Sequence, residues 1–184
     1  IGDSDVFADI SPMEIYKQVG ITSYDYAAGN ASNLLMYYMV KESLKYQKPS
    51  LVVIDCASIF NNVEQEERTH QIMDGINDDV KWEFINDSAY DFDFNNKIKF
   101  VFPLFRFHNK WSEITTKDLA KLNSNTREES YYLKGFNLSY QTQAASNGDS
   151  YMDETEHQTE FATSVLPEAV LRIKKLCEEN GIKF

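Results

Sequence analysis

The chain opens on Ile1-Gly2-Asp3-Ser4, an apolar residue followed by Gly-Asp-Ser, which is typical of a strand leading into a loop with a nucleophilic serine. A strand of a parallel sheet normally needs about four to eight apolar residues, so most of this first strand is expected to precede Ile1. At the other end, Gly181-Ile182-Lys183-Phe184 indicates a helix stop and the start of another strand. We therefore expect a fragment, incomplete at both ends, whose exposed sheet edge is covered by missing residues or by a second copy of the chain.

Alternating helix and strand signals follow this opening. Ser11-Pro12-Met13-Glu14 combines an N-cap serine, a proline in the first turn and a capping-box glutamate, which predicts a helix that stops at Gly20. Residues 21–26 favour a short strand, and a helix is expected from Ser32 to about Gln47. The β-branched run Leu51-Val52-Val53-Ile54 predicts a buried strand parallel to 21–26. These elements predict an α/β fold with a parallel sheet covered by helices on both faces.

The remainder of the chain is expected to belong to the same single domain, residues 1–184. A helix is expected over 64–75, one short helix among loops over 77–94, and a helix instead of a strand over 97–111. The polar stretch around 123–160 follows a short helix at 116–122 and has the length of an insertion. The last helix is expected to begin at Pro167 and end at Gly181.

Composition excludes several classes of partner. The 184 residues carry a net charge of −11, which argues against nucleic acid and against an anionic membrane surface. No apolar run is long enough for a membrane span within the chain. Cys56 and Cys177 lie in apolar segments and are expected to be buried free thiols. Neither cofactor nor metal is expected, because the acidic clusters Asp78-Asp79 and 87–93 lack the spacing of a calcium loop or a zinc site.

Several of these segments together resemble the SGNH or GDSL hydrolases, in particular a bacterial branch of cell-surface SGNH proteins. The resemblance rests on the chain order of the strand-end Gly-Asp-Ser, the capped helix after it and the segments that follow. Those segments are Tyr24-Asp25-Tyr26-Ala27-Ala28-Gly29-Asn30, Leu51-Val52-Val53-Ile54-Asp55, residues 102–111 and Lys134-Gly135-Phe136. It implies a three-layer flavodoxin-like fold and a location outside the cytoplasm or at the cell surface.

The resemblance also implies serine chemistry. Ser4 would be the nucleophile, with its own backbone N–H as one donor to the oxyanion. Gly29 would supply a second N–H, and Asn30 would add a side-chain donor. Without the resemblance, Gly29 and Asn30 are equally compatible with a plain left-handed turn. The expected activity is hydrolysis of an O-acyl ester, such as an acetyl ester, on a carbohydrate or cell-envelope polymer.

Two departures from the family pattern leave alternatives open. The block after the third predicted strand does not match the family's asparagine donor, since Asn61 comes only after Asp55-Cys56-Ala57-Ser58-Ile59-Phe60. The family's Asp and His lie beyond further strands, and His157 has the wrong spacing to replace that histidine, so it is interpreted as a surface residue. His70 is interpreted as lying on a solvated helix. The alternatives are an acyltransferase that uses the same serine and a binding or scaffold protein without catalysis.

Overall fold

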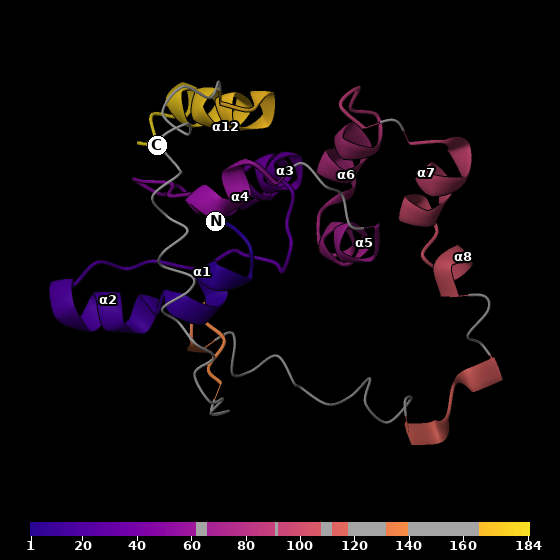
Figure 1. The fold of residues 1–184 in the computed structure, drawn as a ribbon, viewed down its shortest axis with the longest axis horizontal. Coiled ribbons are helices and arrows are strands. Elements are labelled where there is room, and N and C mark those ends of the chain that lie inside the picture. Colours follow the sequence, from indigo (N-terminus) through magenta and orange to yellow (C-terminus); the bar gives the residue numbers. More distant parts are fainter. Residues whose placement is uncertain (62–65, 91, 108–111, 118–131, 140–165) are drawn as a thin grey trace, which may run out of the picture.

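Helices joined by loops and short extended segments make up the described part of the protein (Figure 1). In a computed structural model, the described residues are 1–61, 66–90, 92–107, 112–117, 132–139 and 166–184. The helices that concern the fold and the site are α1 (Ser4–Asp9), α2 (Pro12–Val19), α3 (Asn33–Ser43), α4 (Cys56–Ile59), α5 (Glu66–Asp74), α6 (Asp78–Ile85), α7 (Phe94–Val101), α8 (Leu104–Phe107) and α12 (Glu168–Glu179).

The predicted parallel sheet, and with it the α/β flavodoxin-like fold, is wrong. Within the described ranges, residues 21–26 and 51–55 form no strands, and backbone pairing is limited to two isolated parallel bridges, Gly2 with Ala27 and Leu51 with Lys183. In each bridge a single residue of one segment pairs with a single residue of the other, and one such pair does not make a β-ladder. The predicted buried strand is also mostly exposed: Leu51 is 55% and Val53 61% accessible. A parallel sheet needs both faces covered, and these side chains are not covered.

Local signals at the helix ends were read correctly. The Ser11 hydroxyl accepts a hydrogen bond from the Glu14 N–H, and α2 ends at Gly20, whose φ of 72° is left-handed. The Ser32 hydroxyl likewise accepts from the Leu35 N–H at 3.1 Å, so α3 begins where expected. This helix ends at Ser43 and not near residue 47. The expected last helix is confirmed as α12, with Gly181 at φ 67° behind it.

The expectations for the middle of the chain are partly confirmed. α5 and α6 lie within the stretches where helices were expected. The expected helix over 97–111 begins earlier, as α7, and is interrupted at Phe102-Pro103 before α8, because proline cannot continue the helical hydrogen bonds. Residues 108–111 and most of the polar stretch around 123–160 lie outside the described residues.

The core is centred on α3, which packs against α12 and α6. Its buried Tyr38 ring meets the ring of Phe84 on α6 edge to face, with 5.3 Å between the ring centres. Phe84 in turn contacts Phe100 on α7 and the rings of Tyr90 and Phe92. The aromatic residues of this part of the chain therefore divide into two groups: these four rings pack in or against the core, whereas the side chains of Trp82, Phe94, Phe102, Phe105 and Phe107 are exposed.

A partly buried polar contact ties α12 to this core. The guanidinium of Arg172 lies 2.7 Å from the carboxylate of Asp87, which also accepts a hydrogen bond from the Tyr38 hydroxyl. Arg172 also lies over the ring of Tyr37, 4.2 Å from its centre. Burial works against ionisation of Asp87, but the bonds from Arg172 and Tyr38 hold its pKa below the ordinary value. The helices are therefore joined by a charged contact as well as by apolar surface.

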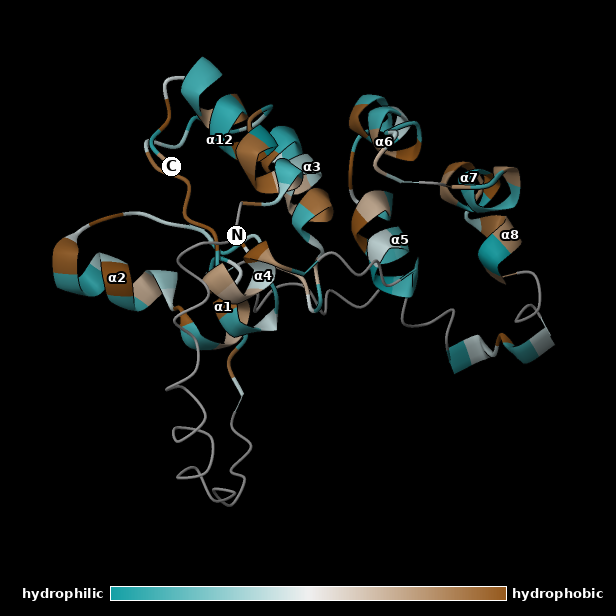
Figure 2. Ribbon diagram, turned by 45° about the horizontal axis from the view of Figure 1, so that its top comes forward, coloured by the Kyte–Doolittle hydropathy of each residue, from teal (hydrophilic) through white to brown (hydrophobic). Residues whose placement is uncertain are grey.

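Helix α2 stands apart from this core, and brown bands on it in Figure 2 mark apolar residues. Its Met13 and Val19 side chains are exposed. The expectation for the two thiols is half right, because Cys177 is buried but Cys56 is exposed. None of the described helices combines the length and apolar character required to cross a membrane.

We expect Phe84→Ala to lower the free energy of unfolding by about 3–5 kcal/mol, because it removes the ring at the centre of the aromatic cluster. Trp82→Ala is the matched control on the same helix, since that side chain is 53% exposed, and it should change stability by less than about 1 kcal/mol. Urea denaturation of both variants measures the difference. Equal losses of unfolding free energy in the two variants would show that the aromatic cluster around Phe84 is not the main source of stability in the core.

Candidate functional site

Ser4 is the first residue of α1 and is exposed. The preceding residue, Asp3, caps the helix by accepting a hydrogen bond from the Asp5 N–H at 3.0 Å. Gly2 is buried, and a Cβ there would lie 2.6 Å from Val6 Cγ2 and 2.7 Å from Asp55 Cβ. A glycine at this position therefore allows the segment before Ser4 to approach its neighbours closely.

The turn predicted to supply oxyanion donors lies against the same segment. Gly2 forms the isolated parallel bridge with Ala27, and its carbonyl accepts a hydrogen bond from the Ala28 N–H at 3.1 Å. Gly29 and Asn30 follow in a turn in which Asn30 has a φ of 57°. Gly2 and Ala27 pair in this bridge, so Ser4 comes shortly after one of the paired residues and the turn comes shortly after the other.

Asp55 lies on the other side of the opening segment. Its N–H donates to the Ile1 carbonyl at 2.9 Å. Its carboxylate caps α4 by accepting from the Ala57 and Ser58 N–H groups, and it also accepts from the Ser58 hydroxyl at 2.8 Å. The Ser58 oxygen in turn accepts from the Asp3 N–H at 3.1 Å. Buried Ser58 therefore links Asp3 to Asp55.

Ser58 is a site residue that the sequence reasoning missed. Its signal is the spacing Asp55-x-x-Ser58, in which an aspartate at a helix start can bind the residue three positions later. Asn61, which does not match the family's asparagine donor in position, lies beside the turn at residues 27–30. Its side-chain amide donates a hydrogen bond to the Ala31 carbonyl at 3.2 Å.

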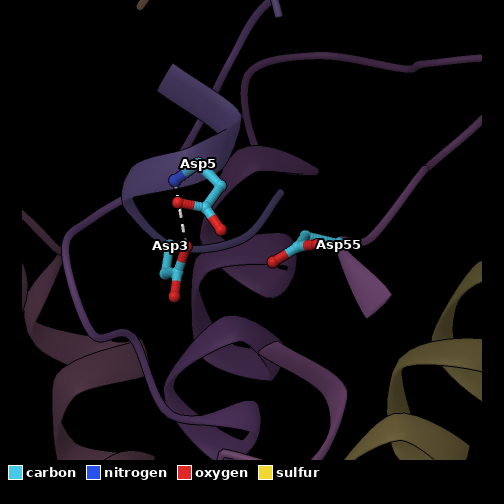
Figure 3. A group of neighbouring side chains, drawn as sticks. All are labelled: Asp3, Asp5 and Asp55. Atoms are coloured by element: carbon cyan, nitrogen blue, oxygen red, sulfur yellow. Dashed lines mark hydrogen bonds between the residues drawn. The ribbon is translucent and has the colours of Figure 1, made fainter. Parts of the chain in front are cut away.

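The carboxylates of Asp3, Asp5 and Asp55 lie close together, as Figure 3 shows, and the first two residues flank Ser4 in the chain. Their nearest oxygens lie within 4.8 Å of one another. The negative charge of Asp3, with smaller contributions from slight desolvation, Asp55 and Asp9, raises the pKa of the exposed Asp5. Oxygen ligands of this kind suit Mg²⁺ or Ca²⁺. Exposed carboxylates also gather without a metal, so we assign no ion here.

No imidazole among the described residues contacts Ser4. His70 was expected on a solvated helix, but it is 2% exposed and stacks on Phe100, away from α1. His108 and His157 lie outside the described residues. A base for Ser4 is therefore not provided by the described histidine.

Residues 132–139 lie next to α1, where they appear as the orange segment in Figure 1. The Asn137 N–H donates to the Phe7 carbonyl at 2.7 Å, and the Asp25 N–H donates to the Lys134 carbonyl at 2.8 Å. Gly135 has a φ of 93°, and a Cβ there would lie 2.0 Å from the Asp25 carbonyl oxygen. Only glycine permits this approach.

Asp25 is buried beneath this segment, and one of its carboxylate oxygens has no hydrogen-bond partner among the described residues. Burial raises its pKa to about 6. Its ionised form is therefore disfavoured in the folded protein.

Comparisons with protein-family models, with curated proteins and with solved structures found no match.

We expect Gly2→Ala to lower the free energy of unfolding by about 1–3 kcal/mol, because the new Cβ would press on Asp55 and Val6. Gly29→Ala is the matched control, since a Cβ at Gly29 meets nothing within 4 Å, and it should cost less than about 1 kcal/mol. Thermal unfolding of the two variants measures the difference. If Gly2→Ala left the stability unchanged, Gly2 would pack less closely against Asp55 than the 2.7 Å separation implies.

We expect Asp25→Asn to be more stable than the unaltered protein at pH 8 and to have nearly the same stability at pH 4. The pKa of Asp25 is raised in the folded state, so its contribution to stability is full below about pH 4 and is lost as pH rises through about 6. Asparagine does not ionise, so the variant should lack this loss, which is worth about 1–3 kcal/mol. Urea denaturation across this pH range is the measurement, and parallel curves for the two proteins would contradict it.

Proposed function

We propose that Ser4 is the nucleophile of an SGNH-type serine esterase that removes a small acyl group, such as acetyl, from a carbohydrate or cell-envelope polymer. The observation that carries the proposal is the exposed Ser4 at the start of α1, with the Ala27–Asn30 turn next to it through the Gly2 bridge. A nucleophile must be reachable by substrate, and backbone N–H groups must lie close to the reacting carbonyl.

In the proposed reaction, the Ser4 hydroxyl oxygen attacks the ester carbonyl and a general base takes its proton. The N–H groups of Ser4 and Gly29, with the Asn30 side chain, stabilise the oxyanion. The ester's alcohol leaves with the proton, and an acyl group remains on Ser4. Water then attacks this acyl group, which releases the carboxylic acid and restores the hydroxyl.

The charges around Ser4 narrow the class of substrate. Asp3 and Asp5 flank the nucleophile, and Asp55 lies close to both carboxylates. Negative charges repel an anionic ester and would favour one that is neutral or carries an ammonium group. We therefore propose a neutral or cationic acyl ester.

Two other functions use the same surface. An acyltransferase would pass the acyl group from Ser4 to an alcohol instead of water. A binding or scaffold protein would use the surface without chemistry, and one observation favours it: the Asp55 carboxylate is engaged by Ser58 and by the α4 N–H groups, and no described imidazole lies beside Ser4.

The test uses the full-length protein, as its gene encodes it, and an activated acetyl ester as the substrate. Ser4→Ala should reduce hydrolysis by about 10³-fold or more, because it removes the nucleophile of a working site. Ser23→Ala is the matched control, since Ser23 is exposed and has no part in the proposed chemistry, and it should leave the rate unchanged.

Product analysis separates the alternatives. Acetic acid as the main product supports the esterase, whereas an acetylated alcohol formed when glycerol is added would indicate the transferase. Equal rates for Ser4→Ala and the unaltered protein, with no label on Ser4 from a fluorophosphonate probe, would leave the scaffold function in its place.

A further inference from the structure

The hydroxyl group of Ser58 lies beside the peptide that precedes the proposed nucleophile. Its oxygen accepts a hydrogen bond from the Asp3 N–H at 3.1 Å, and its proton is donated to the Asp55 carboxylate at 2.8 Å. An amide N–H can only donate and an ionised carboxylate can only accept, so both roles of the hydroxyl are fixed. Ser58 is 0% exposed, so a substrate on the surface of the protein does not reach it.

Asp55 holds the Ser58 side chain in this place. Its carboxylate accepts hydrogen bonds from the Ala57 N–H at 3.1 Å and from the Ser58 N–H at 3.2 Å, in addition to the Ser58 hydroxyl. The Asp55 N–H donates to the Ile1 carbonyl at 2.9 Å. The main chain of Asp55 thus binds the opening segment of the protein, while its side chain fixes the orientation of Ser58.

The peptide group between Gly2 and Asp3 is bonded at both of its polar ends. Its N–H donates to Ser58, and its carbonyl, which belongs to Gly2, accepts from the Ala28 N–H at 3.1 Å. The peptide is trans and planar, so its N–H and C=O point in opposite directions and bind a neighbour on either side. One neighbour is Ser58 and the other is the turn at residues 27–30. The orientation of this peptide therefore relates Ser4 to the proposed oxyanion donors.

Asp3 carries this restraint to Ser4. Its carboxylate accepts from the Asp5 N–H at 3.0 Å, and its backbone is not helical, with φ −97° and ψ −149°. Because Ser4 is the next residue, the direction of its N–H follows from these dihedral angles. A rotation of the Gly2–Asp3 peptide would therefore move both the N–H and the side chain of Ser4.

We infer that Ser58 is a positioning residue, whose hydroxyl fixes the Gly2–Asp3 peptide and thereby the placement of Ser4 against the turn at residues 27–30. The inference rests on the ester chemistry proposed above, and it adds a residue that touches neither the substrate nor the reacting atoms. Loss of the hydroxyl would displace the nucleophile without removing a contact to the substrate. A displacement of about 1 Å lowers the rate of such a reaction by about 10²-fold.

The test is Ser58→Ala in the full-length protein, with an activated acetyl ester as the substrate. The kcat should fall by about 10–100-fold, whereas KM should change by less than about threefold, because the contacts that bind the substrate are kept. Labelling of Ser4 by a fluorophosphonate probe should slow in parallel with kcat. Ser43→Ala is the matched control: the Ser43 hydroxyl donates to the Val40 carbonyl at 2.7 Å within α3, and its loss should leave kcat unchanged.

Circular dichroism shows whether Ser58→Ala is folded at the temperature of the assay. If it is not, Ser58→Cys takes its place, because the sulfur atom fills the space of the hydroxyl but is a weak hydrogen-bond partner. A folded variant that keeps its kcat, or that changes only KM, would overturn the inference.

Ser4→Ala in the same assay keeps the two proposals apart. Loss of hydrolysis in Ser4→Ala, together with an unchanged kcat in the folded Ser58 variant, would refute the role of Ser58 alone. Unchanged hydrolysis in Ser4→Ala would refute the nucleophile itself, and the role of Ser58 with it.

Discussion

The packing of α12 against α3 depends on the contact of Arg172 with Asp87 and Tyr38. This contact joins α12, near the end of the chain, to α3 and to the loop after α6. A charge that is partly removed from water is costly unless it is paired, and in this contact a guanidinium, a carboxylate and a phenol bind one another. Loss of one member would leave another unpaired beside the apolar core. The geometry of α3 therefore depends on residues far away in the sequence.

The candidate site is held by a different kind of interaction, namely main-chain hydrogen bonds between short extended segments. Gly2 lies between the Ala27 segment on one side and the Asp55 segment on the other. Backbone pairing positions Ser4 without requiring apolar burial around it, which is why the serine is exposed although Gly2, two residues before it, is buried. The acidic groups around Ser4 add a negative potential to this surface.

The sequence predicted those features that depend on local chemistry. Ser11, Pro12 and Gly20 act within one turn of their own helix, so the bounds of α2 could be read from them. The apolar run 51–54 could not be interpreted in the same way, because a buried strand requires partners from distant segments, and only Val52 is buried. His70 was misread for a related reason: its neighbours Glu67 and Arg68 are polar, whereas its burial comes from Phe100 on another helix. Ser58 was not anticipated, because its link from Asp3 to Asp55 depends on a hydrogen bond between segments that are distant in the sequence.

The exposure of Cys56 has a practical consequence for following this surface. The chain's other thiol, Cys177, is buried, so the two cysteines differ in their access to reagents. A maleimide fluorophore would attach at Cys56, directly after Asp55 and at the start of α4. The native chain therefore already contains a site for a fluorophore whose emission could report ligand binding near Ser4, and no engineered cysteine is required.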